Sequence, residues 1–207
     1  MVKLKKNLNL NRTYRNTDVA TLPDGAYLYL IEYNPETNRY HNVIWNNADN
    51  HGDAYNKLAW QAFGSGYDAI IECNDDVVFN PWTYELLMED VASLDPSETG
   101  WVCVRSDNIR STQNIKFIDK DEMFETWVVS PILGYISKEA WIDYLPLNDF
   151  GDDVQCMDMT AKGLKHYVSR AYAHHVGSHT LKTVGNPHYG RDRERLKELR
   201  PEYYKGF

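Results

Sequence analysis

Three polar clusters in the chain combine residue types that bind metal ions or move protons. The first, Asn74-Asp75-Asp76, follows the apolar stretch 67–73 and precedes a second apolar run. Adjacent carboxylates about 4 Å apart repel each other by roughly 1–4 kcal/mol between bulk water and a protein surface. A divalent cation would relieve this repulsion, and Mg²⁺ and Mn²⁺ bind carboxylate oxygen while keeping sites for phosphate oxygens. The alternative is a turn whose Asp caps the helix expected to start at Pro81.

The second and third clusters lie in the C-terminal half of the chain. Asp152-Asp153 follows Gly151 at the expected start of a helix, where acids cap the helix and suit its dipole. A carboxylate at the rim of a metal site can instead act as a general base. In the third cluster, His174-His175, an imidazole can add a nitrogen ligand to an oxygen-rich Mn²⁺ site. Gly177 and Ser178 next to it offer a backbone amide or a hydroxyl to phosphate. The alternative for this cluster is a surface loop.

Periodicity and turn signals place these clusters beside regular elements. Helices are predicted at 53–64, 81–94 and 152–163, with a short one at 138–144, and strands at 26–33, 40–45, 67–73, 101–105 and 167–173. Strands and helices alternate in units of about 25–35 residues, which indicates an α/β domain with a mostly parallel sheet. Ligands bind such sheets at the carboxyl ends of the strands. We therefore expect the first and third clusters to share one edge of the sheet.

Length and composition limit the class of protein. The 207 residues predict one domain, residues 1–185 including a polar N-terminal segment 1–24, followed by a charged tail, 186–207, expected to be helical. The net charge of −8 argues against nonspecific nucleic-acid binding. Three separated cysteines suit a reducing compartment. No apolar run approaches the ~18–20 residues of a membrane span, and no apolar leader opens the chain. These features predict a cytoplasmic protein.

Taken in order, the clusters resemble motifs of the inverting, metal-dependent glycosyltransferases of GT-A fold, especially the large family 2. The resemblance rests on Asn74-Asp75-Asp76, a glycine-bearing segment at Gly134, the acid pair Asp152-Asp153, and His175. Upstream, residues 50–57 resemble the loop and helix with an internal Asn that precede the acidic motif in that family. The resemblance covers roughly residues 40–180. It implies a single Rossmann-like GT-A domain, with a mostly parallel central sheet flanked by helices.

The resemblance also implies roles for individual residues. Asp76 and His175 would hold Mn²⁺ or Mg²⁺, and Asp153 would be the general base with Asp152 beside it. The resemblance places Asn74, Asp75, Asn56 and Lys57 near the nucleotide, its ribose or its diphosphate. Ser178, the phosphate-binding candidate named above, belongs to the same group. The donor would be a nucleotide-diphosphate sugar, with UDP favoured. The acceptor would be a hydroxyl of a sugar, lipid, protein or modified base that the sequence does not identify.

Two departures from the family pattern leave other functions open. The acid pair follows glycine as Gly-Asp-Asp rather than Gly-Glu-Asp, which shortens the reach by one methylene, and residues 1–24 contain no apolar first strand. One alternative is a noncatalytic sugar- or nucleotide-binding module of the same fold. Another is a different metal-dependent nucleotide-sugar enzyme such as a nucleotidyltransferase, although the N-terminal region lacks the glycine-rich phosphate loop typical of that class.

Overall fold

The computed structural model describes residues 31–34, 39–42, 47–48, 50–74, 76–177 and 187–204. Three short strands form a small antiparallel sheet: β1 (Ile31–Asn34), β2 (Arg39–Asn42) and β3 (Asn47–Ala48). The other elements are α1 (His51–Gly64), β4 (Ala69–Cys73), β5 (Val77–Phe79), α2 (Thr83–Ala92), β6 (Thr99–Arg105), β7 (Phe124–Thr126), β8 (Leu133–Ser137), α3 (Gly151–Ala161), β9 (Lys165–His175) and α5 (Tyr189–Leu199). Across these ranges, no helix combines the length and the apolar character needed to cross a membrane.

The main sheet has six strands and is mostly antiparallel. Its order is β4-β8-β6-β9-β5, and β7 also pairs with β9. Strand β6 runs parallel to β9, whereas the pairs β4–β8, β6–β8, β5–β9 and β7–β9 are antiparallel. The predicted Rossmann-like GT-A domain with a mostly parallel sheet is therefore wrong.

The difference arises from segments that carry no crossover helix. A parallel neighbour requires a connection of a dozen or more residues, usually a helix, whereas an antiparallel neighbour does not. Residues 106–132 contain no helix, and the chain then returns as β8, antiparallel to β6. The predicted short helix at 138–144 is likewise a turn followed by irregular structure. Strand β5 has only three residues, too few for a periodic pattern to reveal.

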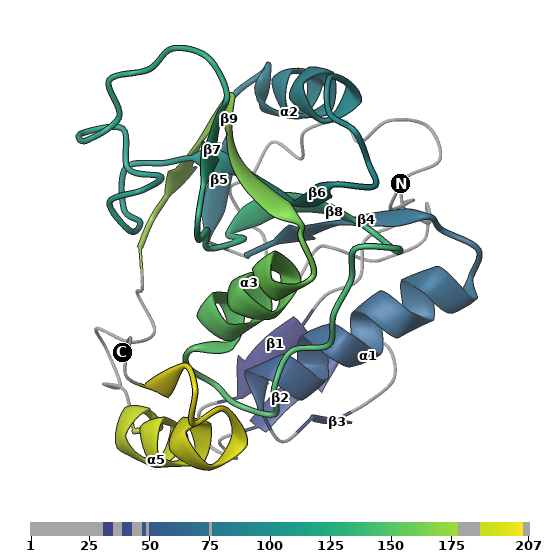
Figure 1. Ribbon diagram of the computed structural model, residues 1–207, viewed down its shortest axis with the longest axis vertical. Helices are drawn as coiled ribbons and strands as arrows, with labels where there is room; N and C mark the ends of the chain where they lie inside the picture. Colours follow the sequence, from purple (N-terminus) through teal and green to yellow (C-terminus); the bar gives the residue numbers. More distant parts are fainter. Residues whose placement is uncertain are drawn as a thin grey trace.

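Both faces of the main sheet are covered by helices, with α2 on one side and α1 and α3 on the other (Figure 1). Side chains alternate between the two faces along a strand. In β6, Trp101 and Cys103 belong to the core that includes residues of α1 and α3, whereas Val102 and Val104 belong to the core with Leu87 of α2. All five are almost completely buried. The unbroken apolar run 101–104 thus reflects a strand buried on both faces.

Helix α1 holds the segment that leads to α3. Asn50 caps the helix, because its Oδ1 accepts a 2.9 Å hydrogen bond from the Asp53 amide. The Asn56 side chain donates to the carbonyl of Tyr144 and accepts from its amide, both at 2.8 Å. The Gly52 amide donates to the Leu147 carbonyl at 2.9 Å. These contacts fix the path of the chain shortly before the acid pair.

Residues 187–204 pack against α3 and the segment before it. The buried Asp192 of α5 accepts hydrogen bonds from the amides of Asn148 and Asp149, at 2.6 and 3.2 Å. From beyond α5, Arg200 forms a 3.1 Å ion pair with Asp158 of α3. The segment that enters α3 is therefore held from two directions, by α1 and by α5.

We predict that Gly52→Ala destabilises the protein by about 1–3 kcal/mol or more, as overpacking does. An added Cβ would lie 1.9 Å from the Leu145 carbonyl oxygen, so the α1 contact with the 144–147 segment must open. Chemical denaturation measures the free energy of unfolding. Gly64→Ala, at the end of the same helix with no atom within 4 Å of the new Cβ, is the matched control and should change stability little. Equal effects of both substitutions would contradict the close approach.

Candidate functional site

The structure brings Asp76 and His175 together through the pairing of β5 with β9. Val77 lies opposite His175 in this antiparallel pair, and the Val176 amide donates to the Asp76 carbonyl at 2.9 Å. His175 Nε2 lies 3.1 Å from Asp76 Oδ1. The two residues assigned to a metal by resemblance are thus direct neighbours.

The hydrogen bonds of His175 fix which ring nitrogen carries a proton. Its Nδ1 lies 2.6 Å from the backbone carbonyl of Asn108, which can only accept, so Nδ1 is the donor. In the neutral ring the lone pair is then on Nε2, which faces Asp76. Metal-binding histidines are commonly oriented in this way, by donating the second ring N–H to a carbonyl or carboxylate.

The Asp76–His175 pair fits a divalent ion as a partial ligand set. Their 3.1 Å separation is that of a hydrogen-bonded ion pair, and a carboxylate oxygen and an imidazole nitrogen are both ligands that divalent ions such as Mn²⁺ accept. Among the described residues, no group of three or more His, Cys, Asp or Glu side chains is arranged to hold a metal ion. Mg²⁺ is often held by one or two protein carboxylates with phosphate and water completing its shell. A nucleotide diphosphate would supply such oxygens.

The contact between His175 and Asp76 shifts the pKa of both side chains. The hydrogen bond to Asp76 raises the pKa of His175, despite partial burial. The same hydrogen bond, from His175, lowers the pKa of Asp76. A metal ion here would therefore compete with a proton for Nε2 of His175.

A second cluster forms where Arg110 meets the two acids at the start of α3. The arginine donates from Nη1 to Asp153 Oδ1 at 2.7 Å, from Nη2 to Asp152 Oδ2 at 2.9 Å, and from Nε to Ser130 Oγ at 2.7 Å. Residue Phe150, before the helix, has a left-handed backbone with φ of 65°. Arg110 and Ser130 were missed from the sequence, because nothing in the polar stretch 106–126 marks one arginine as the partner of distant acids.

The two acids differ in how fully their oxygens are used. Asp152 accepts hydrogen bonds from Arg110, from Ser130 Oγ at 2.6 Å and from the Asp153 amide at 3.0 Å. Among the described residues, the Asp153 carboxylate accepts from Arg110 alone, at Oδ1. Burial and the charge of Asp152 raise the pKa of Asp153, and Arg110 opposes both effects. Asp153 therefore combines a raised pKa with a carboxylate oxygen, Oδ2, that accepts no hydrogen bond from the described residues.

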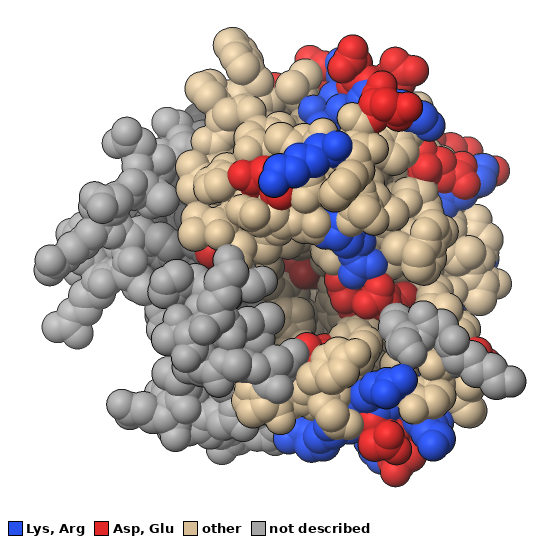
Figure 2. Space-filling model, turned by 90° about the vertical axis from the view of Figure 1, so that its left-hand side faces the viewer, with Lys and Arg blue, Asp and Glu red and all other residues tan. Residues whose placement is uncertain are grey.

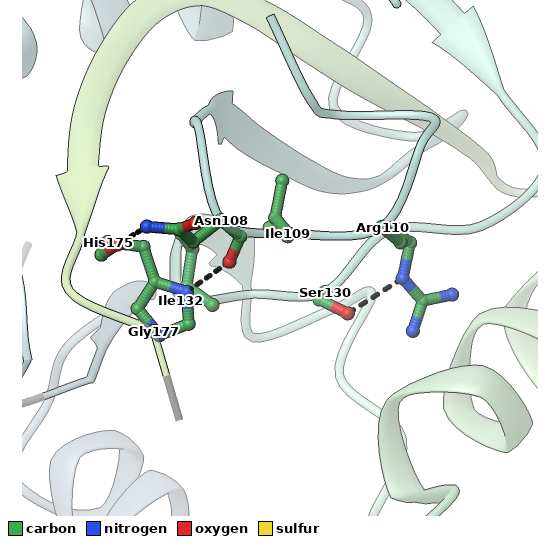
Figure 3. Close-up of a pocket in the computed structure, with 7 residues that line it drawn as sticks. All are labelled: Asn108, Ile109, Arg110, Ser130, Ile132, His175 and Gly177. Carbon is green, nitrogen blue, oxygen red and sulfur yellow. Dashed lines mark hydrogen bonds between the residues drawn. The ribbon is translucent and has the colours of Figure 1, made fainter. Parts of the chain in front are cut away.

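An open pocket of about 450 Å³ connects the two clusters and is lined by Asn108, Ile109, Arg110, Ser130, Ile132, His175 and Gly177. Figure 3 shows His175 and Gly177 at one end, Arg110 at the other, and Ile132 and Ser130 between them. The surface of one side of the molecule is hollowed, with acidic side chains in the hollow and cationic ones beside them (Figure 2). Small-molecule sites have volumes of about 300–1,000 Å³.

The other residues predicted for the site have different positions. Asn74 lies beside the pocket, because its backbone N–H donates to the backbone carbonyl of the lining residue Ile132 at 2.8 Å. Asn56 uses both ends of its amide on the Tyr144 backbone, and Lys57 is exposed on α1. Neither of these two lines the pocket. Asp75 and Ser178 lie outside the described residues.

A buried carboxyl group, also missed from the sequence, lies within the core near the acid pair. Glu72 of β4 is 7% exposed and accepts a 3.0 Å hydrogen bond from the Tyr144 hydroxyl. Burial raises the pKa of Glu72 well above its ordinary value, and the nearby charge of Asp152 acts in the same direction. Burial therefore favours the protonated form of Glu72. The position of Glu72 inside an apolar run does not by itself indicate that its pKa is raised.

No protein-family model matches the chain, and a search of curated proteins returns no match. The candidate site therefore has to be interpreted from its own geometry.

We predict that Glu72→Gln stabilises the protein relative to wild type, by an amount that grows as pH rises from about 5 to about 7. Above the ordinary pKa of 4.5 the unfolded chain releases the Glu72 proton while the folded protein keeps it. The unfolded state then binds fewer protons, so wild-type stability falls with pH, by up to about 1.4 kcal/mol per unit for one group. Urea denaturation over this pH range measures the trend.

The control for this prediction is Glu139→Gln, the same chemical change at an exposed position after β8. It should give a difference from wild type that does not vary with pH. If Glu72→Gln behaved in the same way, Glu72 would be ionised in the folded protein.

Proposed function

We propose that the protein is an inverting glycosyltransferase that moves a sugar from a nucleotide-diphosphate donor to a hydroxyl acceptor. UDP-sugars are the first donors to test. The observation that carries the proposal is one pocket lined by His175 at one end and by Arg110 at the other, with Asp76 bound to His175 and Asp153 bound to Arg110 behind this lining. Donor activation and proton removal need two such centres, separated by the reacting sugar.

The donor diphosphate belongs at the His175 end of the pocket. Asp76 and His175 would hold Mn²⁺ or Mg²⁺ there, and the bound ion supplies positive charge to the leaving diphosphate. Asn74 adjoins this part of the pocket through Ile132, in keeping with a contact to ribose or diphosphate.

The acceptor belongs at the Arg110 end, where Asp153 is the general base. Asp153 takes the proton of the acceptor hydroxyl while the acceptor oxygen bonds to the sugar C1. The bond between C1 and the diphosphate oxygen breaks, and attack from the Asp153 side inverts the anomeric centre. A raised pKa suits this role, because a carboxylate that binds protons more strongly is a better base.

A second candidate is a noncatalytic protein that binds a sugar or nucleotide in the same pocket. The observation in its favour is that Arg110 engages both acids, as it would in a purely structural ion pair. Turnover measurements separate the two functions. Binding of a nucleotide without transfer or hydrolysis of any donor sugar would favour the noncatalytic candidate.

We predict that Asp153→Asn lowers the rate of sugar transfer by roughly 10²–10⁴-fold, the usual contribution of a general base. Nucleotide affinity should stay near the wild-type value, because Asp153 lies away from the donor end. Release of nucleotide diphosphate from UDP- and GDP-sugars, with and without Mn²⁺, measures the rate. Asp158→Asn on the same helix, which contacts Arg200 rather than the pocket, should retain transfer. Wild-type turnover in Asp153→Asn would exclude it as the base.

We predict that Asp76→Ala weakens Mn²⁺-dependent nucleotide binding by at least about tenfold, as loss of a metal-site group does. Calorimetric titration with UDP in the presence and absence of Mn²⁺ measures the effect without requiring turnover. Asp68→Ala, an exposed acid before the other end of β4, is the control and should bind like wild type. Equal affinities for all three proteins would remove Asp76 from the metal site.

A further inference from the structure

Arg110 is shared between the pocket and the acid pair. It lines the pocket, and its two terminal nitrogens each bind a different carboxylate, at 2.7 and 2.9 Å. The side chains of Asp152 and Asp153 are only 27% and 21% exposed. Two adjacent acids removed from water in this way tend to retain one proton between them unless a cation lies beside both.

We propose that Arg110 is the positioning residue for the general base: its fork keeps both acids charged and fixes Asp153 through Oδ1, which leaves Oδ2 for the acceptor hydroxyl. This inference rests on the proposed function, since it assigns Arg110 a role in the same reaction. Arginine suits the task, because its planar fork binds two oxygens at once and its charge is permanent.

Among the described titratable groups around the acid pair, Arg110 is the one that supplies a positive charge. Titratable residues that face the acids electrostatically from the neighbouring elements are Arg110, His51, Glu72, Cys103, Tyr144 and Cys156. Burial lowers the pKa of His51 to about 4, so its ring is neutral at neutral pH. Burial also raises the pKa of Glu72, of Tyr144 and of both cysteines, which favours their neutral forms. Within the described ranges, Arg110 is therefore the cation that opposes burial and the charge of Asp152, which both raise the pKa of Asp153.

A clamp of purely structural function is the competing explanation. Arg105, a few residues earlier, provides the comparison, because its three hydrogen bonds all go to backbone carbonyls, those of Ser169, Lys120 and Glu122. It ties segments together without touching a carboxylate. If Arg110 acted in that way, its loss would lower activity by the same factor at every pH.

The first experiment compares the pH dependence of kcat/KM for wild type, Arg110→Gln, Arg110→Lys and Arg105→Gln. Loss of the Arg110 charge should move the acid limb of the profile to higher pH by about one unit or more, so the deficit is about tenfold larger at low pH than at high pH. Arg110→Lys keeps the positive charge, so the acid limb of its profile should lie close to the wild-type pH. Arg105→Gln should leave it in place. A deficit in Arg110→Gln that does not vary with pH would overturn the proposal.

The second experiment needs no turnover and separates this proposal from the proposed function. Carbon-13 NMR of the Asp carboxyl groups in the ligand-free protein follows the titration of Asp152 and Asp153. Arg110→Gln should raise the titration midpoint of at least one of them by about a unit, and Arg110→Lys by less. Unchanged midpoints in both variants would overturn the role of Arg110. If the midpoints shift in the variants while the wild-type protein transfers no sugar, the role of Arg110 is supported and only the proposed reaction is wrong.

Discussion

The pairing of one arginine with two adjacent acids is the interaction on which the rest of the site depends. Asp152 and Asp153 open α3 in a half-buried position, where neither charge is stable without a nearby cation. Arg110 meets both and also binds Ser130, which itself donates to Asp152. The contact joins the segment after β6, the segment before β8 and the start of α3. The first two of these parts line the pocket, and the start of α3 lies behind Arg110.

The other end of the pocket depends on an antiparallel contact. Strand β5 is short and begins directly after the acidic cluster, and its pairing with β9 places Asp76 against His175. A parallel sheet had been expected to bring the same residues to a common edge. The structure achieves their proximity by a different route, with Asp76 in the turn between β4 and β5 rather than at the end of a parallel neighbour.

Residues of helix α1 that resemble a binding motif also have structural contacts. Asn50, Gly52 and Asn56 resemble a nucleotide-binding sequence, yet in the folded protein they cap the helix, permit a close contact and hold Tyr144. An amide and a carboxamide have the same hydrogen-bonding groups whether the partner is a ligand or the backbone. Residue type alone therefore does not distinguish the two functions.

The sequence by itself determined the longer local elements, although the helix expected at 138–144 does not form. Helices predicted at 53–64, 81–94 and 152–163 correspond to α1, α2 and α3, and the strands at 67–73, 101–105 and 167–173 to β4, β6 and β9. Periodicity, caps and turns act between residues a few positions apart, so the chain displays them directly. Tertiary structure alone decided the direction of the strands, the partners of Arg110 and the raised pKa of Glu72. All three depend on contacts between segments that are distant in the chain, or on how far those contacts exclude water. The local order of residues does not indicate such contacts.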